Sequence, residues 1–165
     1  MWVTQLDIIT LGNNNHIYIF GGPAVDPRVL SEVLVKLYRL RLYRTLLTSE
    51  QLRFYFLKLA ETEDSKLEYL EIGKVDLSSI PGEILGPALV RVECVDLMNT
   101  NITPEQVYDV YWSVLIAKKI NLRQLCLDIN VKSIVTSNVL SEAKSKMKVV
   151  ILDDFAISLY FGLEE

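Results

Sequence analysis

The sequence predicts an α/β fold: a solenoid of repeated strand–turn–helix units, with a curved parallel sheet and with helices on its outer face. A spacing of apolar–x–x–apolar–x–apolar residues recurs along the chain, beginning at Leu37, Leu67, Val92, Leu122 and Met147. From one start to the next, the numbering advances alternately by 30 and by 25. After each pattern the apolar residues change from alternating to helical spacing, which is typical of a strand followed by a helix. One such unit cannot bury its own apolar face, so neighbouring units must stack.

A second comparison supports the alternation, because one long and one short unit together make a doubled period of 55 in the numbering. At this offset the segment 45–52 matches the segment 100–107. Four positions of the match are identical: Thr45 and Thr100, Thr48 and Thr103, Glu50 and Glu105, Gln51 and Gln106. The match does not depend on the leucine spacing, so it is an independent indication of the doubled period.

The N-terminal region predicts a capping hairpin followed by the first strand, together residues 1–20. Residues 3–11 are strand-like, and the Gly-Asn-Asn-Asn stretch at 12–15 is a turn signal. The second strand of the hairpin is expected at residues 16–20. The alternative interpretation is that residues 3–8 form an irregular strand of an earlier repeat.

The repeated units predict parallel strands centred on residues 16–20, 39–43, 69–73, 94–98, 124–128 and 149–153. In the long units, Thr48 with Gln51 and Thr103 with Gln106 fit capping boxes, and Pro104 occupies the first helical position. The helices of the short units are expected to begin near Pro27, Pro81 and Ser137.

The C-terminal region, residues 147–165, predicts a terminal strand or cap. Phe155, Ile157, Leu159 and Phe161 alternate along it. The alternative is that the array is cut there and that the chain is a piece of a longer one. We expect residues 1–165 to form a single domain, because two units of about 80 residues would each be near the lower limit for an independent core.

The Leu-x-x-Leu-x-Leu spacing, with a further apolar residue five positions later at Leu47, Leu77, Ile102 and Ile157, resembles the leucine-rich repeat family. The resemblance is to the ribonuclease-inhibitor-like subtype and covers residues 37 to about 157. The ninth position of the repeat, usually Asn or Cys in the family, is here Thr45, Val75, Thr100, Asn130 and Phe155. The asparagine ladder of the family is therefore mostly absent. The resemblance implies a concave sheet that binds protein partners.

Composition and motifs argue against catalysis, cofactors and metals. The only imidazole, His16, has no paired nucleophile in its repeat, and the chain lacks a Gly-Lys-Ser/Thr phosphate loop. Adjacent strand residues point to opposite faces, so Asp153 and Asp154 diverge. Cys94 and Cys126 are expected on neighbouring strands, offset by two residues and about 8 Å apart, beyond disulfide reach. We therefore expect a non-enzymatic protein with no catalytic residues, no metal site and no cofactor.

Charge and hydropathy indicate neither a nucleic-acid nor a membrane partner. The formal charge is −4, and the basic run Lys36, Arg39, Arg41 and Arg44 aligns too few cations for nucleic acid. No apolar stretch reaches the roughly 18 residues of a membrane span. Residues 1–7 lack the basic region of an export signal. We therefore expect a cytoplasmic protein, and a monomer rather than an oligomer.

The concave face is the predicted binding surface, because side chains alternate across a strand and the residues between the buried leucines must point outward. Arg41 should neighbour Glu71 in the middle row of that face. Tyrosine and arginine, the residue types enriched at binding hot spots, gather in the first units. The predicted partner-binding residues are Tyr18, Arg39, Arg41, Tyr43, Tyr69 and Glu71.

Three functions from different classes follow from these observations. The first is a non-enzymatic protein-interaction module that binds an unidentified protein through its concave face. The second is a structural repeat-array fragment of a longer protein, with no partner of its own. The third is an enzyme, which the absence of a catalytic constellation disfavours. Fold alone does not decide between them, because function belongs to a site and not to a scaffold.

Overall fold

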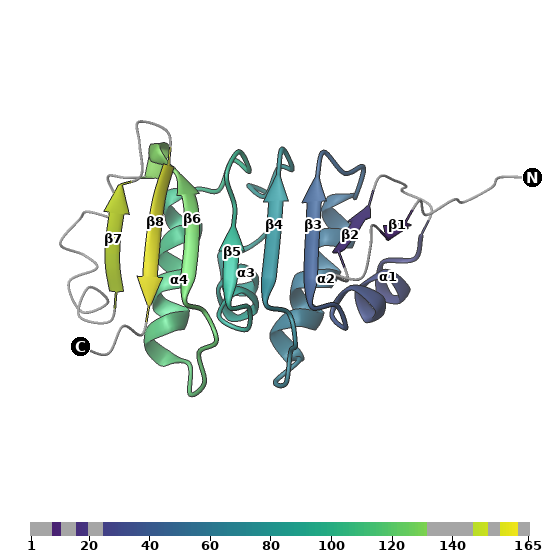
Figure 1. Ribbon diagram of the computed structural model, residues 1–165, viewed down its shortest axis with the longest axis horizontal. Coiled ribbons are helices and arrows are strands. Elements are labelled where there is room, and N and C mark those ends of the chain that lie inside the picture. The colour runs from purple at the N-terminus through teal and green to yellow at the C-terminus, as the bar shows by residue number, and fades with distance from the viewer. Residues whose placement is uncertain (1–7, 11–15, 20–24, 132–146, 152–155, 162–165) are drawn as a thin grey trace, which may run out of the picture.

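One mixed sheet carries all the described helices on one of its faces (Figure 1). The computed structural model describes residues 8–10, 16–19, 25–131, 147–151 and 156–161. Within them the strand order is β1-β2-β3-β4-β5-β6-β8-β7. The elements in chain order are β1 (Ile8–Thr10), β2 (His16–Ile19), α1 (Pro27–Leu34), β3 (Arg39–Tyr43), α2 (Ser49–Glu61), β4 (Tyr69–Gly73), α3 (Gly82–Leu89), β5 (Cys94–Asp96), α4 (Pro104–Ile116), β6 (Gln124–Asp128), the 3₁₀ turn η1 (Ile129–Val131), β7 (Met147–Ile151) and β8 (Ala156–Phe161).

Strands β2 to β6 are parallel, as the repeat predicts, and their register follows the repeat. Leu40 pairs with Leu70, Leu70 with Val95, and Val95 with Leu125. All four side chains are at most 1% exposed. The apolar positions of successive units therefore form one continuous column between the sheet and the helices, so each unit is buried by its neighbours.

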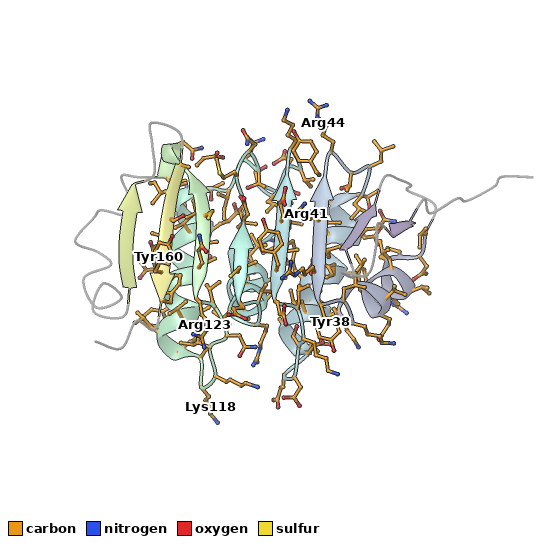
Figure 2. All side chains as sticks on the ribbon, viewed as in Figure 1. Tyr38, Arg41, Arg44, Lys118, Arg123 and Tyr160 are labelled. Atoms are coloured by element: carbon orange, nitrogen blue, oxygen red, sulfur yellow. The ribbon has the colours of Figure 1, made fainter. Side chains whose placement is uncertain are left out.

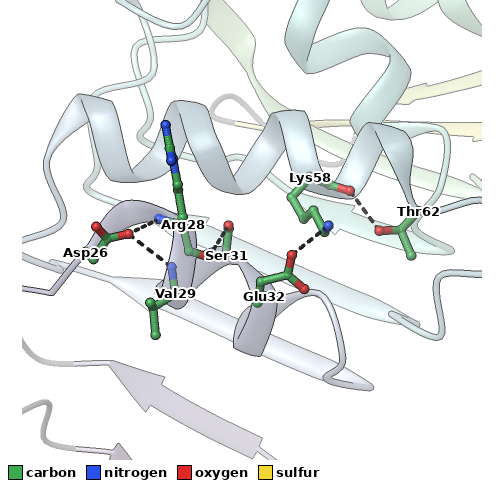
Figure 3. A network of polar contacts seen from close by, with 7 residues as sticks. All are labelled: Asp26, Arg28, Val29, Ser31, Glu32, Lys58 and Thr62. Carbon is green, nitrogen blue, oxygen red and sulfur yellow. Dashed lines mark hydrogen bonds and ion pairs between the residues drawn. The ribbon is translucent and has the colours of Figure 1, made fainter.

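The helices begin where the sequence places their caps. Thr48 and Thr103 each accept a hydrogen bond from the backbone N–H of the glutamine three residues later, and each glutamine accepts one in return, so both capping boxes are present. Helix α1 begins after Asp26, whose Oδ1 accepts from the backbone N–H groups of Arg28 and Val29 at 2.8 and 3.3 Å (Figure 3).

Neighbouring helices pack side by side along the sheet. Between α1 and α2, the Lys58 Nζ lies 2.7 Å from the Glu32 Oε1 (Figure 3). Between α3 and α4 the contact is closer, because Gly82 and Gly86 of α3 face Asp109 and Ser113 of α4. A Cβ atom added to Gly86 would lie 2.6 Å from the backbone oxygen of Asp109, so this helix crossing requires glycine.

The N-terminal hairpin is confirmed over the described residues. Strand β1 pairs antiparallel with β2, and Ile9 lies opposite Tyr18. Strand β2 then pairs parallel with β3 and begins the repeated series. The predicted turn at 12–15 lies outside the described residues.

The last strand, β7, runs in the predicted direction, parallel to β6, but its neighbour differs from the prediction. Strand β7 covers most of the expected 149–153 segment, but it does not pair with β6. Strand β8 lies between them and pairs antiparallel with both. Its buried Ile157 and Leu159 pair with Leu127 and Leu125 of β6 and so extend the apolar core past the last parallel strand. At this end of the sheet the repeat spacing identifies the strand but not its neighbour, because β8 lies between β6 and β7.

Strand alternation within the repeat predicts Val149 and Ile151 on the concave side. The register of β7 pairs these two residues with Leu159 and Ile157 of β8, and the side chains of β7 lie outside the described part of the structure. The terminal-strand prediction for 147–165 is confirmed in part, since both β7 and β8 fall within it. The helix expected near Ser137, and Asp153 and Asp154, lie outside the described residues.

Within the part of the chain that the structure describes, no helix combines the length and the apolar character needed to cross a membrane.

Candidate functional site

The side of strands β3 to β6 that faces away from the helices is called here the open face. It presents Arg39, Arg41 and Tyr43 of β3, Tyr69, Glu71 and Gly73 of β4, Cys94 and Asp96 of β5, and Gln124, Cys126 and Asp128 of β6. Figure 2 shows Arg41 near the middle of this face and Arg44 at the edge where the parallel strands end. Burial alternates along β3, β5 and β6 as the predicted division between core and open face requires, and along β4 it alternates up to Gly73, which is buried.

Arg41, Tyr69 and Glu71 form a network at the centre of the open face. The Arg41 Nε lies 2.9 Å from the Glu71 Oε2, and the Tyr69 hydroxyl donates to the same oxygen at 3.2 Å. The guanidinium of Arg41 also lies 5.6 Å from the centroid of the Tyr69 ring, within cation–π range. The predicted proximity of Arg41 and Glu71 is confirmed, and its cause is their direct pairing in the register.

The environment of Tyr69 keeps its hydroxyl protonated. Burial is the main cause, and the carboxylates of Glu71 and Asp96 act in the same direction, so the pKa of Tyr69 rises to about 12. Arg41 opposes this shift. Tyr69 therefore acts as a hydrogen-bond donor on this face, and its bond to Glu71 restrains the ring.

A hollow of about 380 Å³ opens beside this network. Its walls are Arg39, Arg41, Glu68, Tyr69, Glu93 and Cys94. The Arg39 Nε lies 4.0 Å from the Glu68 Oε2, and both side chains are about half exposed. Burial raises the pKa of the Cys94 thiol, with the Glu93 carboxylate adding to the effect. The thiol therefore remains protonated and is a poor nucleophile.

Sequence reasoning missed a cationic rim at the ends of β3 and β4, formed by Tyr43, Arg44 and Lys74. Arg44 and Lys74 are the first residues after their strands, and both have a positive φ, 49° and 56°. The Arg44 guanidinium and the Lys74 Nζ each lie 5.6 Å from the centroid of the Tyr43 ring. The sequence predicts that Arg44 lies in a turn. It also contains one indication that Lys74 is close to it. Arg44 and Lys74 occupy the same place in consecutive units, so their turns should lie side by side.

Tyr43 lies close to the backbone of the next strand because its register partner is Gly73. A Cβ atom at position 73 would lie 2.7 Å from the Tyr43 Cδ2, so any larger residue would displace the ring. A glycine inside a strand often marks such a close approach. The absence of a side chain at Gly73 thus leaves room for the Tyr43 ring beside the turns that begin at Arg44 and Lys74.

The later strands carry the acidic part of the open face. Burial raises the pKa of Asp96, and the carboxylates of Glu71 and Asp128 add to it, although a bond from the Met98 backbone N–H opposes the shift. Asp128 accepts from the backbone N–H of Asn99 at 2.8 Å. Charge on the open face therefore changes from cationic at β3 to acidic at β5 and β6.

The two cysteines are not joined. Cys94 pairs with Gln124, and Cys126 pairs with Asp96, which is the offset that the sequence predicts, and both thiols are free. The Cys126 Sγ lies 3.1 Å from the Ser158 Oγ, and burial raises the pKa of its thiol.

Five of the six predicted partner-binding residues meet on two adjacent strands: Arg39, Arg41, Tyr43, Tyr69 and Glu71. The sixth, Tyr18, pairs with Arg41 across β2 and β3, so its backbone extends the middle row. Among the described residues, no group of three His, Cys, Asp or Glu side chains is placed to hold a metal ion.

Comparison with known proteins returns no match to a family model, to a curated protein or to a solved structure.

Proposed function

We propose that the chain is a leucine-rich repeat solenoid of the ribonuclease-inhibitor-like subtype and that it binds a protein partner through its open face. The five parallel strands, their alternating long and short connections and the two equivalent capping boxes support the repeat assignment. The free thiols Cys94 and Cys126 are compatible with a reducing compartment such as the cytoplasm.

The observation that carries the binding proposal is the network of Arg41, Tyr69 and Glu71. Two strands supply it, and the side chains of Arg41 and Glu71 remain 34% and 26% exposed. Arginine and tyrosine are the residue types that contribute most at protein interfaces. The ion pair and the ring contact already restrain these side chains. Binding of a partner would therefore cost less side-chain conformational entropy.

The geometry favours a protein over a small substrate. The hollow beside the network is bounded by charged side chains, four of its six wall residues being Arg39, Arg41, Glu68 and Glu93. Small-molecule sites are mostly apolar and enclosed. Charged groups that surround an aromatic side chain are, in contrast, typical of a protein interface.

The test compares what three forms of the protein retain from a lysate of the source organism. The forms are the unaltered chain, the open-face variant Arg41→Ala/Tyr69→Ala, and the outer-helix variant Tyr108→Ala/Trp112→Ala. Tyr108 and Trp112 are 39% and 51% exposed on α4, so they offer a rival surface of similar chemistry. Thermal melting of all three forms checks that the fold is intact.

The proposal requires a protein that the unaltered chain and the outer-helix variant retain and that the open-face variant loses. Loss in the outer-helix variant alone would move the site to the helices. If the unaltered chain retains nothing that the open-face variant lacks, the structural array without a partner becomes the better explanation.

A further inference from the structure

We propose that Tyr43, Arg44 and Lys74, defined above as the cationic rim, bind the carboxylates of an acidic segment of the partner protein. This inference rests on the proposed function, since it names the chemistry of a partner that docks on the open face. It adds a second contact region at the edge of the sheet, beyond the central network.

The backbone brings the two cations together. Tyr43 pairs with Gly73, so Arg44 and Lys74 leave neighbouring strands at the same level. The backbone N–H of Arg44 donates to the Gly73 oxygen at 2.9 Å, and that of Lys74 donates to the Asn99 oxygen at 3.0 Å. Each turn is thus hydrogen-bonded to the following unit, which holds its first residue in the left-handed conformation.

The aromatic ring restrains both cations without neutralising them. Each charge lies 5.6 Å from the same centroid, so the two cations lie within twice that distance of each other. A cation–π contact leaves the charge available to an anion, unlike an ion pair. Tyr43 is 41% exposed, and its ring can pack against the apolar part of an approaching side chain.

The rim differs in charge from the rest of the open face. Arg39 and Arg41 lie next to Glu68 and Glu71. In the described part of the chain, by contrast, no carboxylate forms an ion pair with Arg44 or Lys74. Both side chains are exposed. The positive charge of the rim therefore remains uncompensated, and an acidic segment is its complement.

The neighbouring residues favour protein carboxylates over a nucleic-acid backbone. Glu71, Asp96 and Asp128 follow the rim along the open face, and the whole chain has a formal charge of −4. A continuous row of phosphates crossing the sheet would meet these carboxylates. A short acidic segment can contact the rim alone.

The test measures binding of a labelled short peptide that alternates glutamate and serine, by fluorescence anisotropy at low ionic strength. A matched peptide with glutamine in place of glutamate and a labelled oligothymidylate are the comparison probes. The rim variant is Arg44→Asn/Lys74→Asn. Asparagine suits these positions, because Asn99 occupies the equivalent place after β5 with a φ of 61°.

The control variant is Lys66→Asn/Lys118→Asn, which removes the same charge from exposed loops that precede strands. Figure 2 shows Lys118 at the edge of the sheet opposite Arg44. Circular dichroism and thermal melting check that both variants are folded. We expect the rim variant to weaken binding of the acidic peptide at least about fivefold and the control variant to change it by less than about twofold.

Three results would overturn the inference: no binding of the acidic peptide to the unaltered chain, equal weakening by both variants, or tighter binding of the oligothymidylate than of the peptide. The last result would mean that the rim recognises phosphate. Applying the rim variant to the retention experiment separates the two proposals. A partner lost by Arg41→Ala/Tyr69→Ala but kept by the rim variant leaves the open-face function standing and removes the acidic-segment inference.

Discussion

Gln51 and Gln106, which occupy equivalent positions one doubled period apart, connect their helices to the preceding unit in the same way. Each completes the capping box of its own helix through Oε1. Each also donates from Nε2 to a backbone oxygen of the preceding short unit, Gln51 to Val25 at 2.8 Å and Gln106 to Ile80 at 2.6 Å. Val25 and Ile80 are separated by the same doubled period. The repeat of the sequence is therefore also a repeat of inter-unit hydrogen bonds.

The first prediction concerns this connection at Gln106, whose Nε2 also donates to the Leu77 oxygen at 2.7 Å. Gln106→Ala removes the acceptor of the Thr103 backbone N–H in the capping box, keeps the bond from its own backbone N–H to the Thr103 hydroxyl, and leaves two buried carbonyl groups without the Nε2 donor. We expect the free energy of unfolding to fall by about 2–4 kcal/mol, measured by chemical denaturation. Glu105→Ala, at the exposed neighbouring position, should change it by less than about 0.5 kcal/mol. A Gln106→Ala loss as small as that of the control would contradict the role assigned to the side chain.

The second prediction concerns the central column of the core. Val95 is 1% exposed and lies between Leu70 and Leu125 in the register. Val95→Ala deletes buried methyl groups and leaves a cavity that the two neighbours can only partly fill. We expect a loss of about 1–3 kcal/mol in the free energy of unfolding. Val95→Asp should prevent soluble expression, and an Asp variant that melts normally would show that the column tolerates charge.

The third prediction concerns the crossing of α3 and α4. A methyl group at Gly86 would meet the Asp109 backbone oxygen, which cannot rotate away, as well as the Ser113 hydroxyl. Gly86→Ala should therefore lower the melting temperature by an amount corresponding to about 1–3 kcal/mol, although alanine is the better helix former. Adding Ser113→Ala should not restore the loss.

Gly82 provides the matched comparison for this crossing. A methyl group there meets only side-chain atoms of Asp109. Gly82→Ala should therefore be rescued in part by Asp109→Ala in the double variant, because this change removes the carboxylate but keeps the Cβ atom, which would lie 2.9 Å from the added methyl group. Rescue of Gly86→Ala by Ser113→Ala would show that the hydroxyl, and not the backbone, sets the limit at position 86.

The parallel strands are more predictable from the sequence than the C-terminal edge, for a physical reason. Strands β2 to β6 follow from the spacing of Leu40, Leu70, Val95 and Leu125, because repetition fixes both the strand and its neighbour. At β7 the same spacing is present, but its partner is β8, which follows it in the chain. The pairing of strands outside the repeat depends on which strand edge of the folded sheet is still unpaired and apolar. This depends on the tertiary structure and cannot be read from local spacing.

The fourth prediction concerns the ionisation of Tyr69. Its pKa in the folded chain is raised from 10.0 to about 12, first by burial and then by Glu71 and Asp96. The stabilisation linked to this shift is complete below the unfolded pKa and is lost as the pH rises through the folded one. Between pH 10 and 12, Tyr69→Phe should therefore lose less stability than the unaltered chain.

Spectroscopic titration of tyrosinate tests the cause of the shift directly. The difference between the unaltered chain and Tyr69→Phe isolates this one group, because the buried Tyr55 and Tyr111, whose pKa values burial also raises, are common to both. Glu71→Gln should lower the pKa of Tyr69, because it removes a negative charge beside the phenol. An unchanged titration in Glu71→Gln would mean that the carboxylate does not act on Tyr69 in solution.

The candidate site is predictable where it depends on strand register and not where it depends on turns. The neighbours Arg41 and Glu71 follow from counting residues along two repeats, since strand alternation fixes the face. The rim residue Lys74 belongs to a turn whose left-handed conformation is held by a backbone bond to Asn99. The repeat places this turn beside that of Arg44, but no side-chain pattern encodes the backbone bond. The approach of Lys74 to the Tyr43 ring therefore could not be predicted from the sequence.

The last prediction concerns affinity once a partner is identified. Arg41→Ala/Tyr69→Ala should weaken binding at least about tenfold, which corresponds to about 1.4 kcal/mol. Stability should fall less than after a core substitution, because the partly exposed ion pair of Arg41 with Glu71 contributes only about 0–1 kcal/mol and the half-buried Tyr69 lies outside the core. Isothermal titration calorimetry measures the affinity, and thermal melting measures the stability.

The single variants separate contact from positioning in this pair. If Arg41 touches the partner, adding Arg41→Ala to Tyr69→Ala should weaken binding further. If it serves only to hold the ring through their 5.6 Å contact, adding Arg41→Ala to Tyr69→Ala should cost nothing further. Full affinity in the double variant would place the partner elsewhere, on the acidic strands β5 and β6 or on the outer helices, because both residues of the central network would then be dispensable for binding.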